Sequence, residues 1–314
     1  MRMNYLKLAG MNRRSFLRNS VAVAAVPLAS PPTVQAQKAL DAKPFSLDYA
    51  PHFGMFKATA GGDLVKQLEW AHAQGFRSWE DNQMANRSQD DQLRIAAAME
   101  RLNMRMGVFV CNFGTAFGKS SFTSGKKEHM NNFLADLKKA VEVSKRVNAK
   151  WMTVVLGNLQ QNLRIGYQHA NAIEMLRRGA EVLEPHGLTM VMEPLNFRDH
   201  SGMYLERSDH AFMLCKAVQS PSVKILFDIY HQAATEGNII QNINHCWDEI
   251  AYFQVGDNPG RKEPGTGEVN YQKVFAHIRK QGFQGILGME HGNSKGGADG
   301  AQAVVDAYRT ADVH

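Results

Sequence analysis

Four polar residues in the second half of the chain each end a short apolar run: Glu193, Asp228, Gln254 and Glu290. Their separations of 35, 26 and 36 residues indicate that a structural repeat carries them. A carboxylate buried at the end of an apolar run is costly unless it is paired or binds a metal ion. Three carboxylates and one amide oxygen suit Mg²⁺ or Mn²⁺ better than Zn²⁺, which is nevertheless compatible. Each residue alone could equally cap a helix or pair with Lys or Arg, but the four in register predict a divalent-metal site.

The repeat predicts a (β/α)8 TIM barrel, an α/β fold with a single domain. From Phe45 onward, apolar runs of strand length alternate with longer stretches of helical period. Nearly continuous apolar runs are typical of parallel strands that are covered on both faces. The carboxyl ends of barrel strands meet at one mouth, so we expect the four polar side chains to converge there. The expected strands are Phe45–Tyr49, Phe76–Glu80, Met106–Cys111, Trp151–Leu156, Thr189–Glu193, Lys224–Asp228, Ile250–Val255 and Gly285–Glu290.

Segments between the strands carry helix signals. One helix is expected from Leu64 until it stops at Gly75, and another begins after the N-cap Asn270 and stops at Gly282. Each glycine leads directly into an expected strand, so helix, glycine and strand recur as a unit. No GxGxxG pattern follows an early strand, which disfavours a doubly wound sheet.

The first 36 residues have the pattern of an export signal and not of a folded element. Adjacent Arg13 and Arg14 precede Phe-Leu, a weakly apolar run extends from Val21 to Leu28, and small residues precede Gln37. This order is typical of a twin-arginine signal peptide. We therefore expect cleavage before Gln37, a barrel domain at residues 37–314, and a periplasmic or otherwise exported protein.

Changing both Arg13 and Arg14 to Lys tests this export signal. The precursor is expected to stay uncut in the cytoplasm, because the twin-arginine pathway reads the arginine pair as an address. Cell fractionation and the mass of the protein measure the outcome. Normal processing in a strain that lacks the pathway would contradict the prediction.

Composition disfavours several classes of partner. The first 36 residues hold five positive charges, so the formal charge falls from +6 for the whole chain to +1 without them. The pI of 9.2 therefore belongs largely to the signal, and no nucleic-acid partner is expected. The apolar run contains Pro27 and is far shorter than the roughly 20 residues of a membrane span, so no stable membrane anchor is expected. The cysteines, Cys111, Cys215 and Cys246, suggest neither a disulfide framework nor a cysteine zinc site.

Four segments of the second half contain recognisable motifs. They are Glu193-Pro194-Leu195-Asn196-Phe197-Arg198-Asp199, Phe227-Asp228-Ile229-Tyr230-His231, the Gly-rich stretch 260–271, and Gly288-Met289-Glu290-His291. Together they resemble the hydroxypyruvate isomerase family within the xylose-isomerase-like TIM barrel superfamily. The resemblance is strong over residues 188–291 and only general in the first half, where the strand rhythm carries it.

The resemblance implies that Glu193, Asp228, Gln254 and Glu290 hold the metal. It also implies that the two glutamates serve as the catalytic acid and base. Related sugar epimerases have histidine at the position of Gln254, whereas hydroxypyruvate isomerases have glutamine there. Gln254 therefore favours the latter group.

Five further residues are candidates for substrate binding: His231, Arg261, Asp199, Arg198 and Glu80. The resemblance suggests that His231 contacts the substrate, although it could equally hold the strand end. Arg261 would bind a carboxylate of an acidic substrate, and its alternative is an exposed loop charge. Asp199 and Arg198 follow Glu193 at the same mouth, and Glu80 ends the second expected strand.

The implied function is a metal-dependent isomerase of the aldose–ketose type, which acts on a small hydroxy-carbonyl or sugar through an enediolate. Hydroxypyruvate isomerases are ordinarily cytoplasmic, so the export signal keeps two alternatives open: a sugar epimerase, and a lyase or dehydratase of an oxidised sugar or glycoside. A non-catalytic sugar-binding protein is a third alternative, but it would be expected to lack one of the acids. The substrate, the metal and the oligomeric state, a homo-oligomer included, stay open.

Overall fold

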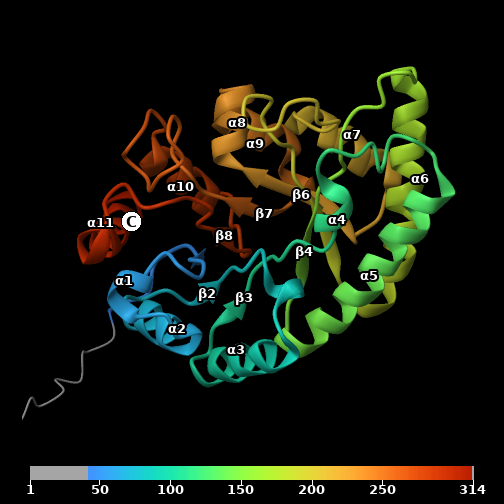
Figure 1. The fold of residues 1–314 in the computed structure, drawn as a ribbon. Helices are drawn as coiled ribbons and strands as arrows, with labels where there is room; N and C mark the ends of the chain where they lie inside the picture. Colours follow the sequence, from blue (N-terminus) through green and yellow to red (C-terminus); the bar gives the residue numbers. More distant parts are fainter. Residues whose placement is uncertain (1–41, 313–314) are drawn as a thin grey trace, which may run out of the picture. The chain divides into compact units, whose positions relative to one another are not determined.

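The strands of the chain form a closed parallel barrel (Figure 1) in the computed structural model, which describes residues 42–312. They are β1 (Tyr49–Ala50), β2 (Ser78–Trp79), β3 (Arg105–Met106), β4 (Trp151–Val154), β5 (Thr189–Met192), β6 (Val223–Asp228), β7 (Ile250–Gln254) and β8 (Leu287–Gly288). Six strands make one sheet in the order β1-β8-β7-β6-β5-β4, and β2 pairs with β3. Single bridges from His52 to Glu80 and from Val110 to Thr153 join the two sheets into a ring. The predicted TIM barrel is confirmed, whereas the predicted export signal lies outside the described residues.

The first strand begins later than the sequence pattern predicts. The pattern indicates Phe45–Tyr49, but Tyr49 and Ala50 are the residues that pair with β8. Ser46 is held instead by Asp312, which accepts hydrogen bonds from the Ser46 backbone nitrogen at 2.6 Å and from Tyr49 Oη at 3.0 Å. This clasp joins the start of the barrel to the end of its last helix. The sequence pattern does not distinguish an apolar residue that packs beside the sheet from one whose backbone pairs within it.

Helices surround the strands, as Figure 1 shows. They are α1 (Lys57–Ala60), α2 (Leu64–Ala73), α3 (Gln89–Arg101), α4 (Phe113–Ala116), α5 (Lys127–Val147), α6 (Ile165–Leu183), α7 (Ser208–Val218), α8 (Ile229–Thr235), α9 (Ile239–Cys246), α10 (Tyr271–Lys280) and α11 (Gly297–Ala311). Helix α8 follows β6 without a loop, so Asp228, the last residue of the strand, is also the N-cap of the helix. Within the part of the chain that the structure describes, no helix is both long and apolar enough to cross a membrane.

The predicted helix ends are confirmed. Gly75 follows α2 with a φ of +99°, and a Cβ atom there would stand 2.7 Å from the Lys43 backbone oxygen, so both the backbone and the packing require glycine. Asn270 caps α10, because its side-chain oxygen accepts a hydrogen bond from the Lys273 backbone nitrogen at 3.1 Å. Gly282 then ends that helix with a φ of +78°.

Apolar side chains fill two zones. A large core lies between strands and helices and includes Met192, Phe227 and Phe253. A smaller layer fills the barrel interior and consists of Ala50, Val108, Val191, Leu226, Tyr252 and Ile286. Successive residues of one strand thus alternate between the two zones.

Candidate metal centre and active site

The four predicted ligands continue the inward-facing positions of their strands. Val191, Leu226 and Tyr252 belong to the interior layer, and Glu193, Asp228 and Gln254 come two residues later. Glu290 likewise follows interior Ile286 by four residues. Because side chains alternate with a period of two, all four are directed toward the barrel axis at the mouth.

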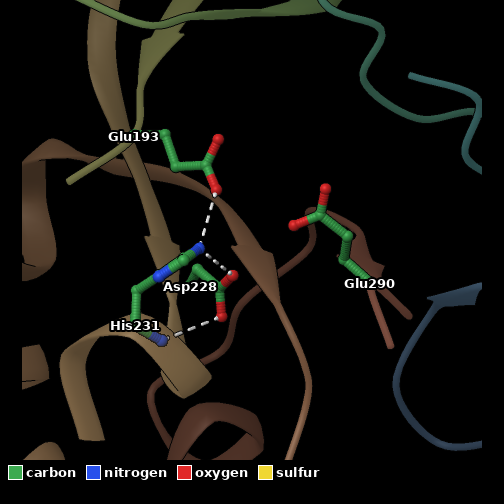
Figure 2. A group of neighbouring side chains, drawn as sticks. All are labelled: Glu193, Asp228, His231 and Glu290. Atoms are coloured by element: carbon green, nitrogen blue, oxygen red, sulfur yellow. Dashed lines mark hydrogen bonds and ion pairs between the residues drawn. The ribbon is translucent and has the colours of Figure 1, made fainter. Parts of the chain in front are cut away.

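Glu193, Asp228, His231 and Glu290 lie together at this mouth (Figure 2). Each offers one potential ligand atom, and these atoms lie within 4.8 Å of one another. Glu193 and Asp228 are buried, and Glu290 is partly exposed. Burial raises the pKa of the Glu193 carboxyl well above its usual range, and the neighbouring charges of Glu290 and Asp228 raise it further. The mutual repulsion of these carboxylates favours the binding of a positive charge among them.

Asp228 uses its two carboxylate oxygens for different contacts. Oδ1 caps α8, accepting hydrogen bonds from the backbone nitrogens of Tyr230 at 2.8 Å and His231 at 3.4 Å. Oδ2 lies 3.1 Å from Arg261 Nη2 and 3.5 Å from His231 Nε2. One side chain therefore caps a helix and still presents an oxygen to the cluster.

Arg261 supplies a positive charge inside the cluster. Its Nη2 donates to Asp228 Oδ2 at 3.1 Å and to Glu290 Oε2 at 2.5 Å, and its Nε donates to the Glu290 backbone oxygen at 3.0 Å. The guanidinium also lies 4.8 Å from the centre of the Tyr230 ring. Asn82 Nδ2 donates to the other Glu290 oxygen at 2.5 Å. Arg261 is thus an ion-paired residue of the site, and the exposed-loop alternative is wrong.

Gln254 is buried at the end of β7, beside Asp228 of β6 in the strand register. Its Nε2 donates to Glu80 Oε1 at 2.9 Å. Its Oε1 is buried and has no hydrogen-bond partner among the described residues. An unpaired buried amide oxygen is costly, and it is also a neutral hard ligand of the kind that Mg²⁺ and Mn²⁺ accept.

His231 presents a donor to the carboxylates. Its Nδ1 accepts a hydrogen bond from the Asn196 backbone nitrogen at 3.2 Å and lies 2.7 Å from Asn196 Nδ2. Burial lowers the pKa of His231 to about 3, so the ring is neutral and its one proton belongs on Nε2. Nε2 lies 3.7 Å from Glu193 Oε1 and, in the described part of the chain, has no hydrogen-bond partner. A protonated Nε2 cannot ligate a metal but can donate to a substrate oxygen.

The remaining predicted residues have three different surroundings. Asp199, exposed in the loop after β5, accepts hydrogen bonds from Asn196 Nδ2 at 2.9 Å and Tyr230 Oη at 2.7 Å, and so ties that loop to α8. Arg198 is exposed on the same loop. Glu80 is buried in the barrel interior, where both carboxylate oxygens accept hydrogen bonds from protein donors.

Two residues of the site were not predicted from the sequence pattern. The side chain of Asn82 hydrogen-bonds to Glu290, and that of Asn196 hydrogen-bonds to His231. Asn196 lies within the recognised Glu-Pro-Leu-Asn motif, so its position carried a signal. Asn82 follows Glu80 by two residues, so the alternation of side chains along a strand places it on the same inward-facing side. That alternation is the sequence signal that could have identified Asn82.

A cavity of about 200 Å³ adjoins Glu290. Its lining includes Glu80, one of the predicted substrate-binding residues, together with His52, Asn82 and Arg87. Ligand pockets usually measure roughly 300–1,000 Å³, so this cavity suits a molecule of few carbon atoms.

The sequence matches the family described as "Xylose isomerase-like TIM barrel" over residues 68–311. It is 30% identical over 167 residues to hydroxypyruvate isomerase from Escherichia coli, a match that covers 53% of this chain and 64% of the relative. It is 28% identical over 160 residues to 2-oxo-tetronate isomerase from Cupriavidus necator, covering 51% of this chain and 62% of the relative. The chain thus spans less than two thirds of the length of either relative.

Solved structures share the fold at lower identity. An AP endonuclease of family 2 from Brucella melitensis superposes with a TM-score of 0.70 at 22% identity, covering 83% of this chain and 99% of that one. The apo form of 3-keto-D-glucoside 4-epimerase from E. coli superposes with a TM-score of 0.68 at 17% identity, covering 84% and 98%. At these identities the likeness is one of fold.

Proposed function

The chain belongs to the xylose isomerase-like TIM barrel family, and from that premise we propose that it is a divalent-metal-dependent isomerase of the hydroxypyruvate isomerase type. Its substrate would be a small hydroxy-carbonyl compound or sugar. The observation that carries the proposal is the meeting of Glu193, Asp228 and Glu290 at the barrel mouth, with their ligand atoms within 4.8 Å. The small cavity beside Glu290 and the similarity to two isomerases of small oxo acids support the same substrate class.

The donor set fits a hard divalent cation. Glu193, Asp228 and Glu290 would supply carboxylate oxygens, and Gln254 would supply the buried oxygen that has no partner in the described residues. Arg261 offsets one of the three carboxylate charges, so a divalent cation would neutralise the remainder. Mg²⁺ and Mn²⁺ match this oxygen set best, and Zn²⁺ is the alternative. When bound, the cation would act as a Lewis acid that stabilises negative charge developing on the substrate oxygens.

The side chains around this position would move and hold protons. One of Glu193 and Glu290 would remove the proton from the hydroxyl-bearing carbon next to the substrate carbonyl, and the other would return a proton to the former carbonyl carbon. The hydroxyl proton would pass to the former carbonyl oxygen, which completes the isomerisation. Burial raises the pKa of Glu193, which suits a group that must hold a proton for part of the cycle. His231 would donate its Nε2 proton in a hydrogen bond to a substrate oxygen.

Metal analysis and solvent exchange test the proposal together. The purified protein is expected to contain, or to bind, Mg²⁺ or Mn²⁺ in elemental analysis. In D₂O it should exchange the α-protons of short hydroxy-carbonyls such as hydroxypyruvate, and chelation should stop the exchange. A cation-loaded protein that exchanges no proton on any short hydroxy-carbonyl or keto-sugar would contradict the proposed activity.

Arg261→Ala is expected to raise the KM for an anionic hydroxy-carbonyl by about 10- to 100-fold with a smaller change in kcat, as for the loss of a charge-assisted hydrogen bond. Arg261 Nη2 already lies between Asp228 and Glu290, so a substrate carboxylate bound there would meet a preplaced cation. Steady-state kinetics at saturating Mn²⁺ measures the effect. Arg207→Ala, which removes an exposed arginine of another ion pair, is the matched control. An unchanged KM would leave Arg261 as a partner of the carboxylates alone and favour a neutral sugar.

A further inference from the structure

Glu80 lies inside the barrel with both carboxylate oxygens occupied. It is 1% exposed, Oε1 accepts a hydrogen bond from Gln254 Nε2 at 2.9 Å, and Oε2 accepts one from Tyr252 Oη at 2.9 Å. Burial and the nearby Glu290 raise the pKa of Glu80 well above its usual range, while its two donors favour the charged form. Oε1 can accept from Gln254 in either protonation state. A buried acid is costly, so its retention here calls for an explanation.

Two glycines leave the space that this buried group occupies. A Cβ atom on Gly288 of β8 would stand 1.7 Å from Glu80 Oε2, and one on Gly107, just after β3, would stand 2.3 Å from Tyr252 Oη. Real side chains never approach so closely, so alanine at either position would displace the group. The interior layer is therefore shaped around the Glu80 carboxyl and the Tyr252 hydroxyl.

The hydrogen bond that Glu80 accepts fixes which end of the Gln254 amide stays unpaired, next to Asp228 in the strand register. An amide has a donor end and an acceptor end of nearly the same shape, and only the acceptor can bind a cation. Glu80 Oε1 accepts from the NH₂ end, and the oxygen is left buried without a partner in the described residues. Without Glu80, the amide could turn and present nitrogen to the cluster.

We propose that Glu80 is a positioning residue that holds the Gln254 amide with its oxygen toward the metal cluster, and so raises the affinity for a divalent cation. This inference rests on the proposed metal-dependent function, with Gln254 as a ligand. In this role Glu80 acts on the cation through Gln254, although its side chain also lines the cavity beside Glu290. Changes to residues that orient metal ligands typically cost about 10- to 100-fold in metal affinity.

The test is Mn²⁺ binding, measured by isothermal titration calorimetry on metal-stripped protein. Glu80→Met removes the acceptor while keeping the side-chain length, and we expect it to raise the Mn²⁺ Kd by about 10- to 100-fold. Glu80→Gln keeps an acceptor oxygen but loses the charge, so it should retain most of the affinity. Tyr252→Phe, the matched control, removes the other partner of Glu80 and should change the Kd by less than about 3-fold, since the bond to Gln254 is kept. Near-UV circular dichroism checks that each variant is folded.

A double-mutant cycle separates positioning from plain loss of charge. In a Gln254→Ala background, Glu80→Met should cost no further Mn²⁺ affinity, because the residue it positions has gone. An equal loss in both backgrounds, or equal losses for Glu80→Met and Glu80→Gln, would mean that Glu80 acts through its charge and would overturn the inference. A wild-type protein that binds no Mn²⁺, Mg²⁺ or Zn²⁺ would overturn the proposed metal function itself. If Glu80→Met does not fold, the comparison of Glu80→Gln with Tyr252→Phe still decides, because a Kd raised 10-fold or more by Glu80→Gln contradicts positioning.

Discussion

Glu193→Gln is expected to keep a divalent cation and to lose substrate proton exchange by about 10²- to 10⁴-fold, the range for loss of a general acid or base. An amide oxygen can still bind a cation, but an amide does not accept a proton at the pH of the assay. Among the described residues, the Glu193 carboxylate is approached by His231 Nε2, at 3.7 Å from Oε1. The oxygens of Glu193 are therefore available to a cation and a substrate. Exchange of substrate α-protons in D₂O, at saturating Mn²⁺, measures the loss.

Glu290→Gln should behave in the same way, since the two glutamates are proposed to share the acid and base roles. Glu249→Gln is the matched control, because Glu249 is a buried glutamate that lies just before β7, away from the mouth, and is paired with Lys224. If Glu290→Gln recovers near-normal exchange when excess Mn²⁺ is supplied, Glu290 is a ligand and no more. If both site variants keep exchanging, another base acts, and His231 is the next residue to test.

Asp228→Ala is expected to have the largest effect on metal affinity. It should raise the Mn²⁺ Kd by more than about 100-fold, because changes to residues that only orient ligands already cost up to about that much. It removes a buried oxygen from the centre of the cluster and also the cap of α8. Loss of the cap should lower the free energy of unfolding by about 1 kcal/mol. Titration calorimetry and chemical denaturation of the metal-free protein measure the two effects separately.

Asp228→Asn separates the cap from the ligand. Asparagine is a good N-cap, so the stability of the metal-free protein should stay close to that of the wild type. Its neutral oxygen should bind Mn²⁺ more weakly than the carboxylate does. A variant that binds Mn²⁺ as tightly as the wild type would show that Asp228 caps α8 without serving as a charged ligand.

The fold could be predicted because the parallel strands are apolar on both faces and each repeat contributes one of them. The convergence of Glu193 and Asp228 follows from the same pattern, since both lie two residues beyond an inward-facing position. The predicted first strand begins too early because Phe45 and Leu47 are apolar, whereas Ser46 lies in a bend and is held by Asp312, which is 266 positions away. Local pattern carries no information about such a partner.

The finer arrangement of the site depends on contacts between distant residues. Asn82 holds Glu290 across 208 positions, and Glu80 holds Gln254 across 174. These pairs meet only because the barrel closes, and which oxygen meets which nitrogen depends on side-chain rotamers. The protonation of His231 likewise follows from the Asn196 backbone, which spacing along the chain does not indicate. Sequence therefore predicted which residue types gather at the mouth but not how their hydrogen bonds orient them.

The clasp between Ser46 and Asp312 also has a consequence for the order of events during synthesis. Asp312 emerges from the ribosome long after Ser46 and Tyr49. The hydrogen bonds from these two residues to Asp312 therefore cannot form until nearly the whole domain has been made. Contacts over such a separation form late, because the intervening chain must first be ordered or pay the entropy of closing a long loop. Until β8 has been synthesised, the strand that pairs with β1 is missing, so the nascent chain exposes the unpaired edge of β1.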